Sequence, residues 1–77
     1  MAPEPRDVWK MIVRADELVK YAPNRDAADA YAQARAVLAD AESAAESLAD
    51  QHVAENFRIQ IRTRLDDIAG RERGGLL

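Results

Sequence analysis

The sequence predicts an all-α domain of three helices. Its composition, the placement of its prolines and glycines, and one long apolar stripe indicate this class. Sixteen of the 77 residues are alanine, the strongest helix former, and neither glycine nor proline occurs from 27 to 69. The stripe repeats at steps of four and three, the heptad spacing that packs one helix against another. Its members are Ala27, Tyr31, Ala34, Leu38, Ala41, Ala45 and Leu48.

The first helix is expected at about 6–21. Pro5 suits its first turn, where the missing N–H has no partner to lose. Pro23 ends it, because proline disfavours the α conformation in the residue before it. The apolar face of this helix consists of Val8, Ile12, Ala15, Val19 and Ala22.

The second helix is expected at about 27–49, with Asp26 as its N-cap. A second face of small residues lies roughly opposite the stripe. Because a helix that is apolar on two sides is usually covered on both, we expect other helices on each side of this one. The second face is formed by Ala28, Ala32, Ala36 and Ala39.

The third helix is expected at about 51–69, although one continuous helix over 27–69 is the alternative. At about 100° per residue, the large apolar residues after 50 fall on the side opposite the stripe. A break near Leu48–Asp50 removes this conflict, and Asp50 can cap the new helix. Gly70 is expected to end it. The chain is thus read as a single domain over 1–77, with helices that assemble into a bundle and mobile ends at 1–5 and 71–77.

The segment from 34 to 69 resembles the tetratricopeptide-like (TPR-like) helix–turn–helix repeats of bacterial regulators. The turn glycine common in such repeats is absent, and no second copy follows at a period near 34. The resemblance implies a protein-binding scaffold. It is carried by Ala34, Arg35, Leu38, Ala41, Ala45, Leu48, Ala49, Asp50, Ala54, Phe57, Arg64, Leu65 and Ile68.

The chain is close to the lower size limit for a domain with a single core. It contains no cysteine and one histidine, so neither disulfides nor a structural metal is expected to stabilise it. The remaining way to stabilise so small a domain is association with another chain, and a homodimer is the expected state. Several apolar and arginine side chains lie off the main stripes and are the candidate interface, since Trp, Tyr and Arg are enriched at interfaces. These are Trp9, Val13, Tyr21, Arg58, Ile59 and Arg62.

No catalytic constellation, metal site or cofactor motif is expected. His52 has only Glu55 nearby in sequence, and no nucleophile accompanies it. The net charge of −3 argues against nucleic acid and anionic membrane as partners, and no segment is apolar enough to span a bilayer.

The expected function is a non-enzymatic, self-associating interaction module, cytoplasmic and bacterial, that serves as an accessory or adaptor subunit of a complex. A nucleic-acid-associated regulator that uses the arginines of the third helix is one alternative, and a docking segment of a modular synthase is another. In the first alternative the arginines would be free, whereas the spacing predicts that two of them pair within the helix. The predicted pairs are Arg62–Asp66 and Arg64–Asp67.

Overall fold

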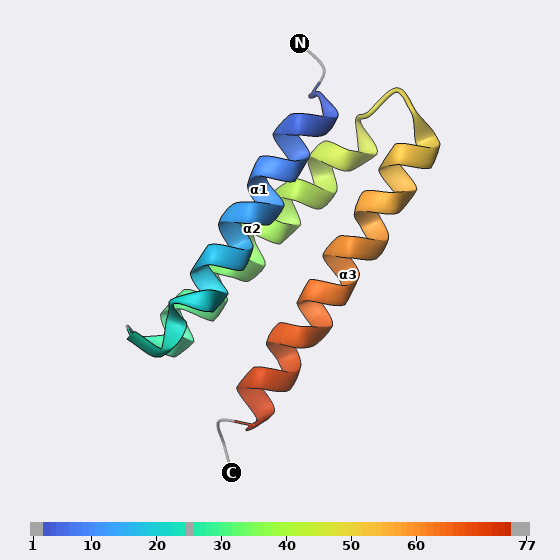
Figure 1. Ribbon diagram of the computed structural model, residues 1–77. Coiled ribbons are helices and arrows are strands. Elements are labelled where there is room, and N and C mark those ends of the chain that lie inside the picture. The colour runs from blue at the N-terminus through green and yellow to red at the C-terminus, as the bar shows by residue number, and fades with distance from the viewer. Residues whose placement is uncertain (1–2, 25, 75–77) are drawn as a thin grey trace.

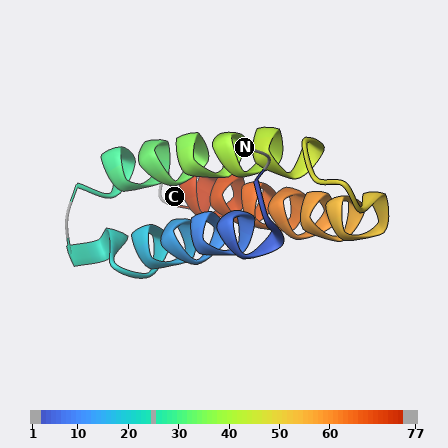
Figure 2. The same ribbon diagram turned by 90° about the horizontal axis from the view of Figure 1, so that it is seen from above.

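A computed structural model describes residues 3–24 and 26–74. It contains three α-helices, α1 (Pro5–Lys20), α2 (Ala27–Glu46) and α3 (Gln51–Gly74), and the described residues form no strand. The helices lie side by side in an elongated molecule of 43 × 18 × 14 Å. The chain reverses direction after α1 and again after α2, so α1 and α3 run parallel and α2 runs antiparallel to both (Figures 1 and 2). The predicted all-α, three-helix class is confirmed.

The start of α1 and the α1–α2 connection follow the expected local chemistry. The Asp7 carboxylate accepts a hydrogen bond of 2.9 Å from the Glu4 backbone N–H, one residue before Pro5 opens the helix. A short 3₁₀ turn, Ala22–Asn24, follows α1. Asp26 then caps α2 by accepting from the Asp29 N–H at 3.2 Å. Proline therefore ends the first helix, and a side-chain carboxylate starts the second.

The predicted break between the second and third helices is confirmed. The second helix ends at Glu46, somewhat before the expected 49. Leu48 in the turn is only 4% exposed and fixes the connection to the core. The Asp50 carboxylate accepts from the backbone N–H groups of His52 and Val53, at 2.9 and 3.2 Å, and so caps α3. The break lets the apolar faces of both helices reach one core.

The third helix continues past Gly70, where we expected it to end. Gly70 has no positive φ angle, so it does not form the left-handed cap that often terminates a helix. Two side-chain contacts hold the extra turn, an ion pair between Glu72 and Arg35 of α2 and an i,i+4 pair between Arg71 and Asp67. Residues 71–74 of the expected mobile C-terminus are thus helical, and residues 75–77 lie outside the described part.

The core lies between α2 and the inner faces of α1 and α3. The inner side of α2 follows the predicted stripe, in which Ala34, Leu38, Ala41 and Ala45 are completely buried. Tyr31 of the stripe is half-buried, and Ala27 is exposed. The remaining buried apolar residues are Val8, Ile12, Ala15, Ala22, Ala30, Leu48, Ala54, Phe57, Ile61 and Ile68.

The second small-residue face of α2 is exposed, so the expectation that helices cover both sides of α2 is wrong for the single chain. Ala28, Ala32, Ala36 and Ala39 are all exposed. Both other helices pack on the inner side instead, where Leu38 and Leu48 offer much more apolar area than alanine does. Among the described residues, no helix is long and apolar enough to cross a membrane.

Candidate functional site

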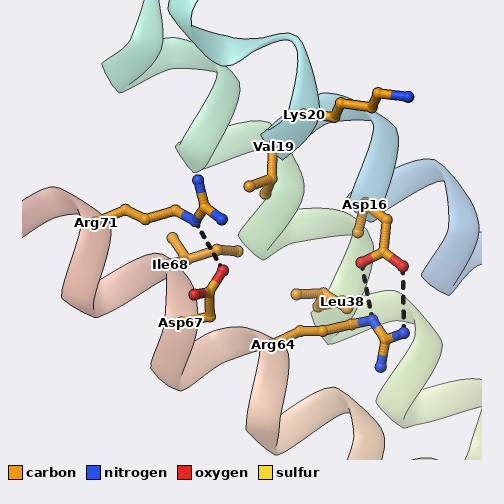
Figure 3. A pocket seen from close by; sticks show the side chains of 9 residues that line it. Asp16, Val19, Lys20, Leu38, Arg64, Asp67, Ile68 and Arg71 are labelled. Atoms are coloured by element: carbon orange, nitrogen blue, oxygen red, sulfur yellow. Dashed lines mark hydrogen bonds and ion pairs between the residues drawn. The ribbon is translucent and has the colours of Figure 1, made fainter.

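A groove lies between the C-terminal half of α1 and α3. Its volume is about 390 Å³. Its apolar lining comes from all three helices, namely Ala15 and Val19 of α1, Leu38 of α2 and Ile68 of α3. Figure 3 shows Leu38 and Ile68 at the floor, with charged side chains along both walls.

Arg64 crosses this groove and joins its two walls. Its Nε donates to one Asp16 carboxylate oxygen at 2.8 Å, and one terminal nitrogen donates to the other at 3.2 Å (Figure 3). The other terminal nitrogen donates to the Gln60 carbonyl at 3.2 Å. A guanidinium held by two parallel bonds to a carboxylate has a fixed orientation. The pair therefore defines the rim of the groove nearer the N-terminus of α1.

The far end of the groove carries a second ion pair. Arg71 donates from Nε to the Asp67 carboxylate at 2.8 Å, and this hydrogen bond raises the pKa of the Arg71 guanidinium above its ordinary value. Lys20 extends away from the groove, and its Nζ lies 5.5 Å from the centre of the Tyr21 ring. The walls thus carry three cations and two carboxylates, with both carboxylates already paired.

Trp9 and Val13, two of the predicted interface residues, lie on the side of α1 that faces α3. The Trp9 ring is 45% exposed, and the Arg64 Cζ lies 6.0 Å from the ring centre, which is within the range of a cation–π contact. Val13, one turn further along α1, is 36% exposed. Trp9 therefore stands beside the Arg64 end of the groove without filling it.

The other predicted interface residues lie elsewhere. Tyr21, 50% exposed, lines a smaller hollow of about 230 Å³ beside Asp26 and Asp29. Ile59 is 57% exposed, and it points away from the core because its neighbours at two residues on each side, Phe57 and Ile61, are buried. Arg58 is paired with Glu55 at 2.8 Å, and Arg62 is exposed on α3. The candidate set does not form one patch.

The interhelical ion pairs could not be found from sequence spacing. Arg64 pairs with Asp16, 48 residues away, and the predicted contact with Asp67 is wrong. Asp67 instead pairs with Arg71, and the predicted Arg62–Asp66 pair is not among the ion pairs of the described residues. The i,i+3 and i,i+4 spacing rule considers only pairs within one helix, so it cannot predict a partner on another helix.

The single histidine of the chain, His52, lies outside the groove. His52 is exposed in the first turn of α3, where only its backbone is used, as a donor to Asp50. Within the described residues, no group of three His, Cys, Asp or Glu is placed to hold a metal ion, and no polar or charged residue is buried. The groove exposes mainly charged side chains, because Ala15, Leu38 and Ile68 beneath them are at most 1% exposed.

No match to this chain was found among protein-family models, curated proteins or solved structures.

Proposed function

We propose that this chain is a non-enzymatic helical interaction module that self-associates as a homodimer and serves as an adaptor or accessory subunit of a larger, bacterial assembly. The observation that carries the proposal is Trp9, a large aromatic side chain left 45% exposed beside an oriented arginine. Trp and Arg are the residue types that most often dominate binding energy at protein interfaces. The resemblance to TPR-like scaffolds supports the same class of function.

The make-up of the core supports association as well. Seven of the fourteen buried apolar residues are alanine, which removes little area from water. A 77-residue chain already buries a smaller share of its surface than a larger domain does. A second copy would add apolar burial to a core that is small for the number of residues it orders.

Three of the five arginines of α3, Arg58, Arg64 and Arg71, are each paired with a carboxylate. The other two, Arg62 and Arg73, are exposed, so the basic surface left on this helix is small. For this reason we favour a protein partner over nucleic acid, and binding that falls steeply with salt would argue the other way.

The test is the mass of the protein in solution. In sedimentation equilibrium we expect the mass to rise with concentration from 8.5 kDa towards twice that value. If folding is coupled to association, the midpoint of thermal unfolding rises with concentration as well. A mass that stays at that of one chain up to millimolar concentration would contradict self-association.

A further inference from the structure

We propose that the solvent face of α1 binds an acidic amphipathic helix of a partner protein. The assignment rests on the adaptor role proposed above and names the chemical class of the partner. The site consists of two adjacent rows of side chains on α1. Trp9 and Val13 form the apolar row, and Arg6, Lys10 and Arg14 form the basic row.

Both rows follow from the spacing of the residues along the helix. Trp9 and Val13 are one turn apart, at i and i+4, and Arg6, Lys10 and Arg14 repeat at the same interval. At about 100° per residue, the two rows together cover roughly 140° of the helix circumference, opposite the buried face of α1. All five side chains are exposed. The rows therefore form one continuous surface.

The cations of this face are largely without partners. Among the ion pairs of the described residues, none involves Lys10, Arg14 or Lys20. Lys20 is exposed on the same side of α1, and its side chain extends away from the groove (Figure 3). Arg6 is paired with Glu4, but an ion pair between two such exposed side chains is weak in water.

Two of the three carboxylates on or beside this face are already engaged. Asp16 holds Arg64, and Asp7 accepts a hydrogen bond from the Glu4 backbone N–H. Glu17 is exposed within the face. Because the whole chain has a net charge of −3, the basic row is a local excess of positive charge on an acidic protein. Such a row attracts carboxylates that are aligned along one side of a partner.

An amphipathic helix fits both rows at once. Side chains at i and i+4 form a ridge that packs between the ridges of a second helix. Apolar residues of the partner would contact Trp9 and Val13, and carboxylates beside them would reach Lys10 and Arg14. Charged residues flank the apolar seam of a coiled coil in the same way and select its partner. From Arg6 to Lys20 the face is roughly 21 Å long at 1.5 Å per residue, which matches about four turns of helix.

The same face is poorly suited to a lipid surface or to nucleic acid. A helix that lies in a lipid interface buries a broad apolar face, and the broad apolar face of α1 is already packed in the core. Base stacking needs open aromatic rings. The Arg64 Cζ lies 6.0 Å from the centre of the Trp9 ring, and the Lys20 Nζ lies 5.5 Å from that of Tyr21. An acidic helix uses the edge of Trp9 and the cations without displacing either contact.

The probes are three synthetic, tryptophan-free peptides of about 20 residues, long enough to form a helix in isolation. They share one leucine spacing and carry Glu, Gln or Lys at the positions beside the leucines. Trp9 is the single tryptophan of the chain, so its emission reports contact. We expect the Glu peptide to shift this emission to shorter wavelength and to bind at least ~10-fold more tightly than the Gln peptide, because several exposed charge pairs form. The Lys peptide should bind more weakly still, and the preference should shrink as salt is raised.

Two double variants with the same change in net charge locate the site. Lys10→Glu with Arg14→Glu reverses the basic row, whereas Arg62→Glu with Arg73→Glu reverses two exposed cations on α3. We expect the first to weaken binding of the Glu peptide at least ~10-fold and the second to leave it within about threefold. Circular dichroism should show native helix content for both. Equal losses would mean that net charge alone governs binding and would overturn the assignment, as would equal binding of the three peptides.

Trp9→Ala tests the apolar row, and Ile59→Ala is its matched control at an exposed apolar side chain of α3. With a labelled Glu peptide and anisotropy as the readout, the first should weaken binding at least ~10-fold and the second should not change it. Equal binding by both variants would remove the apolar row from the site. A shift of Trp9 emission on phosphatidylserine vesicles, with no binding of the Glu peptide, would assign the face to a membrane surface and overturn the proposal.

Failure of this assignment and failure of self-association give different results. A chain that is monomeric in sedimentation but binds the Glu peptide refutes the homodimer alone. A dimeric chain that does not bind the Glu peptide refutes the acidic-helix site alone. If the Lys10→Glu and Arg14→Glu double variant then also fails to dimerise, the solvent face of α1 is the contact between copies and not the site of a partner helix.

Discussion

Both faces of α2 are rich in alanine, and their surroundings are opposite. On the inner face, Ala34, Ala41 and Ala45 are completely buried. On the outer face, Ala32, Ala36 and other alanines at helical spacing are exposed. Alanine by itself therefore does not decide which side of a helix is covered.

The difference lies in the residues that accompany the alanines. The inner stripe includes Leu38, completely buried, and Leu48, 4% exposed, whereas the outer face has no large apolar residue. The outer face instead borders Asp29 and Asp40, both exposed. Burying one leucine removes far more apolar area from water than burying one alanine, so the side with leucine becomes the packed side.

The largest expected effect comes from placing a charge on the inner face. Leu38→Asp removes a completely buried side chain and leaves a carboxylate without a partner in the centre of the core. Core Leu→Ala changes alone cost about 2–5 kcal/mol, and the buried charge adds to that. Because small domains are stable by only about 5 kcal/mol or a little more, we expect the variant to be largely unfolded in a circular dichroism melt. A variant with native helix content and a melting midpoint near the native one would contradict this core.

A matched pair of alanines tests the comparison between the two faces directly. Ala34→Asp and Ala36→Asp make the same change two residues apart on one helix, one buried and one exposed. The first should cost roughly 3 kcal/mol or more in urea unfolding, because it buries an unpaired charge. The second should cost only ~0.7 kcal/mol, which is the difference in helix propensity. Similar losses at both sites would mean that the outer face is covered too, by a second chain.

Most of the fold follows from local signals in the sequence. Pro23 and Asp26 mark the first connection, and the phase shift of the apolar residues after Asp50 marks the second. The proline and the cap act within one helical turn, and the phase shift appears when the apolar patterns before and after Asp50 are compared, so all three can be recognised without the structure. The end of α3 was missed because the helix past Gly70 is held partly by Arg35, a residue on another helix.

The groove could not be predicted from the sequence. Leu38 and Ile68 are recognisable as core residues, but the space above them depends on how α1 and α3 are set against α2. The Asp16–Arg64 pair that forms its rim joins residues far apart in the chain. Trp9 and Val13 were singled out because they lie off the apolar stripe, which is a signal for exposure and not for a contact.

A smaller effect is expected at the turn that allows α2 and α3 to share one core. Asp50→Ala removes the carboxylate that accepts from His52 and Val53 and should cost about 1 kcal/mol in urea unfolding. Backbone amides at Ser47–Asp50 should also exchange with solvent faster than those within α2 and α3, and faster still in the variant. Asp40→Ala, at an exposed carboxylate within α2, is the control and should leave stability unchanged or slightly raised. Uniform protection from Tyr31 to Leu65 would instead indicate one continuous helix.

The smallest expected effect is a gain, at a position where no packing partner is involved. Gly70 lies inside α3, is exposed, and has no heavy atom within 4 Å of the place where a Cβ would lie. Its φ angle is not positive, so alanine can adopt the same backbone. Gly70→Ala should therefore raise the free energy of unfolding by ~0.5–1 kcal/mol, mainly by reducing the freedom of the unfolded chain. Gly74→Ala is the matched control, since it lies in equally open space at the end of the helix, where fraying reduces the gain. If Gly70→Ala is neutral or destabilising, α3 ends near Gly70 in solution, and the turn held by Arg35 and Glu72 contributes nothing to the fold.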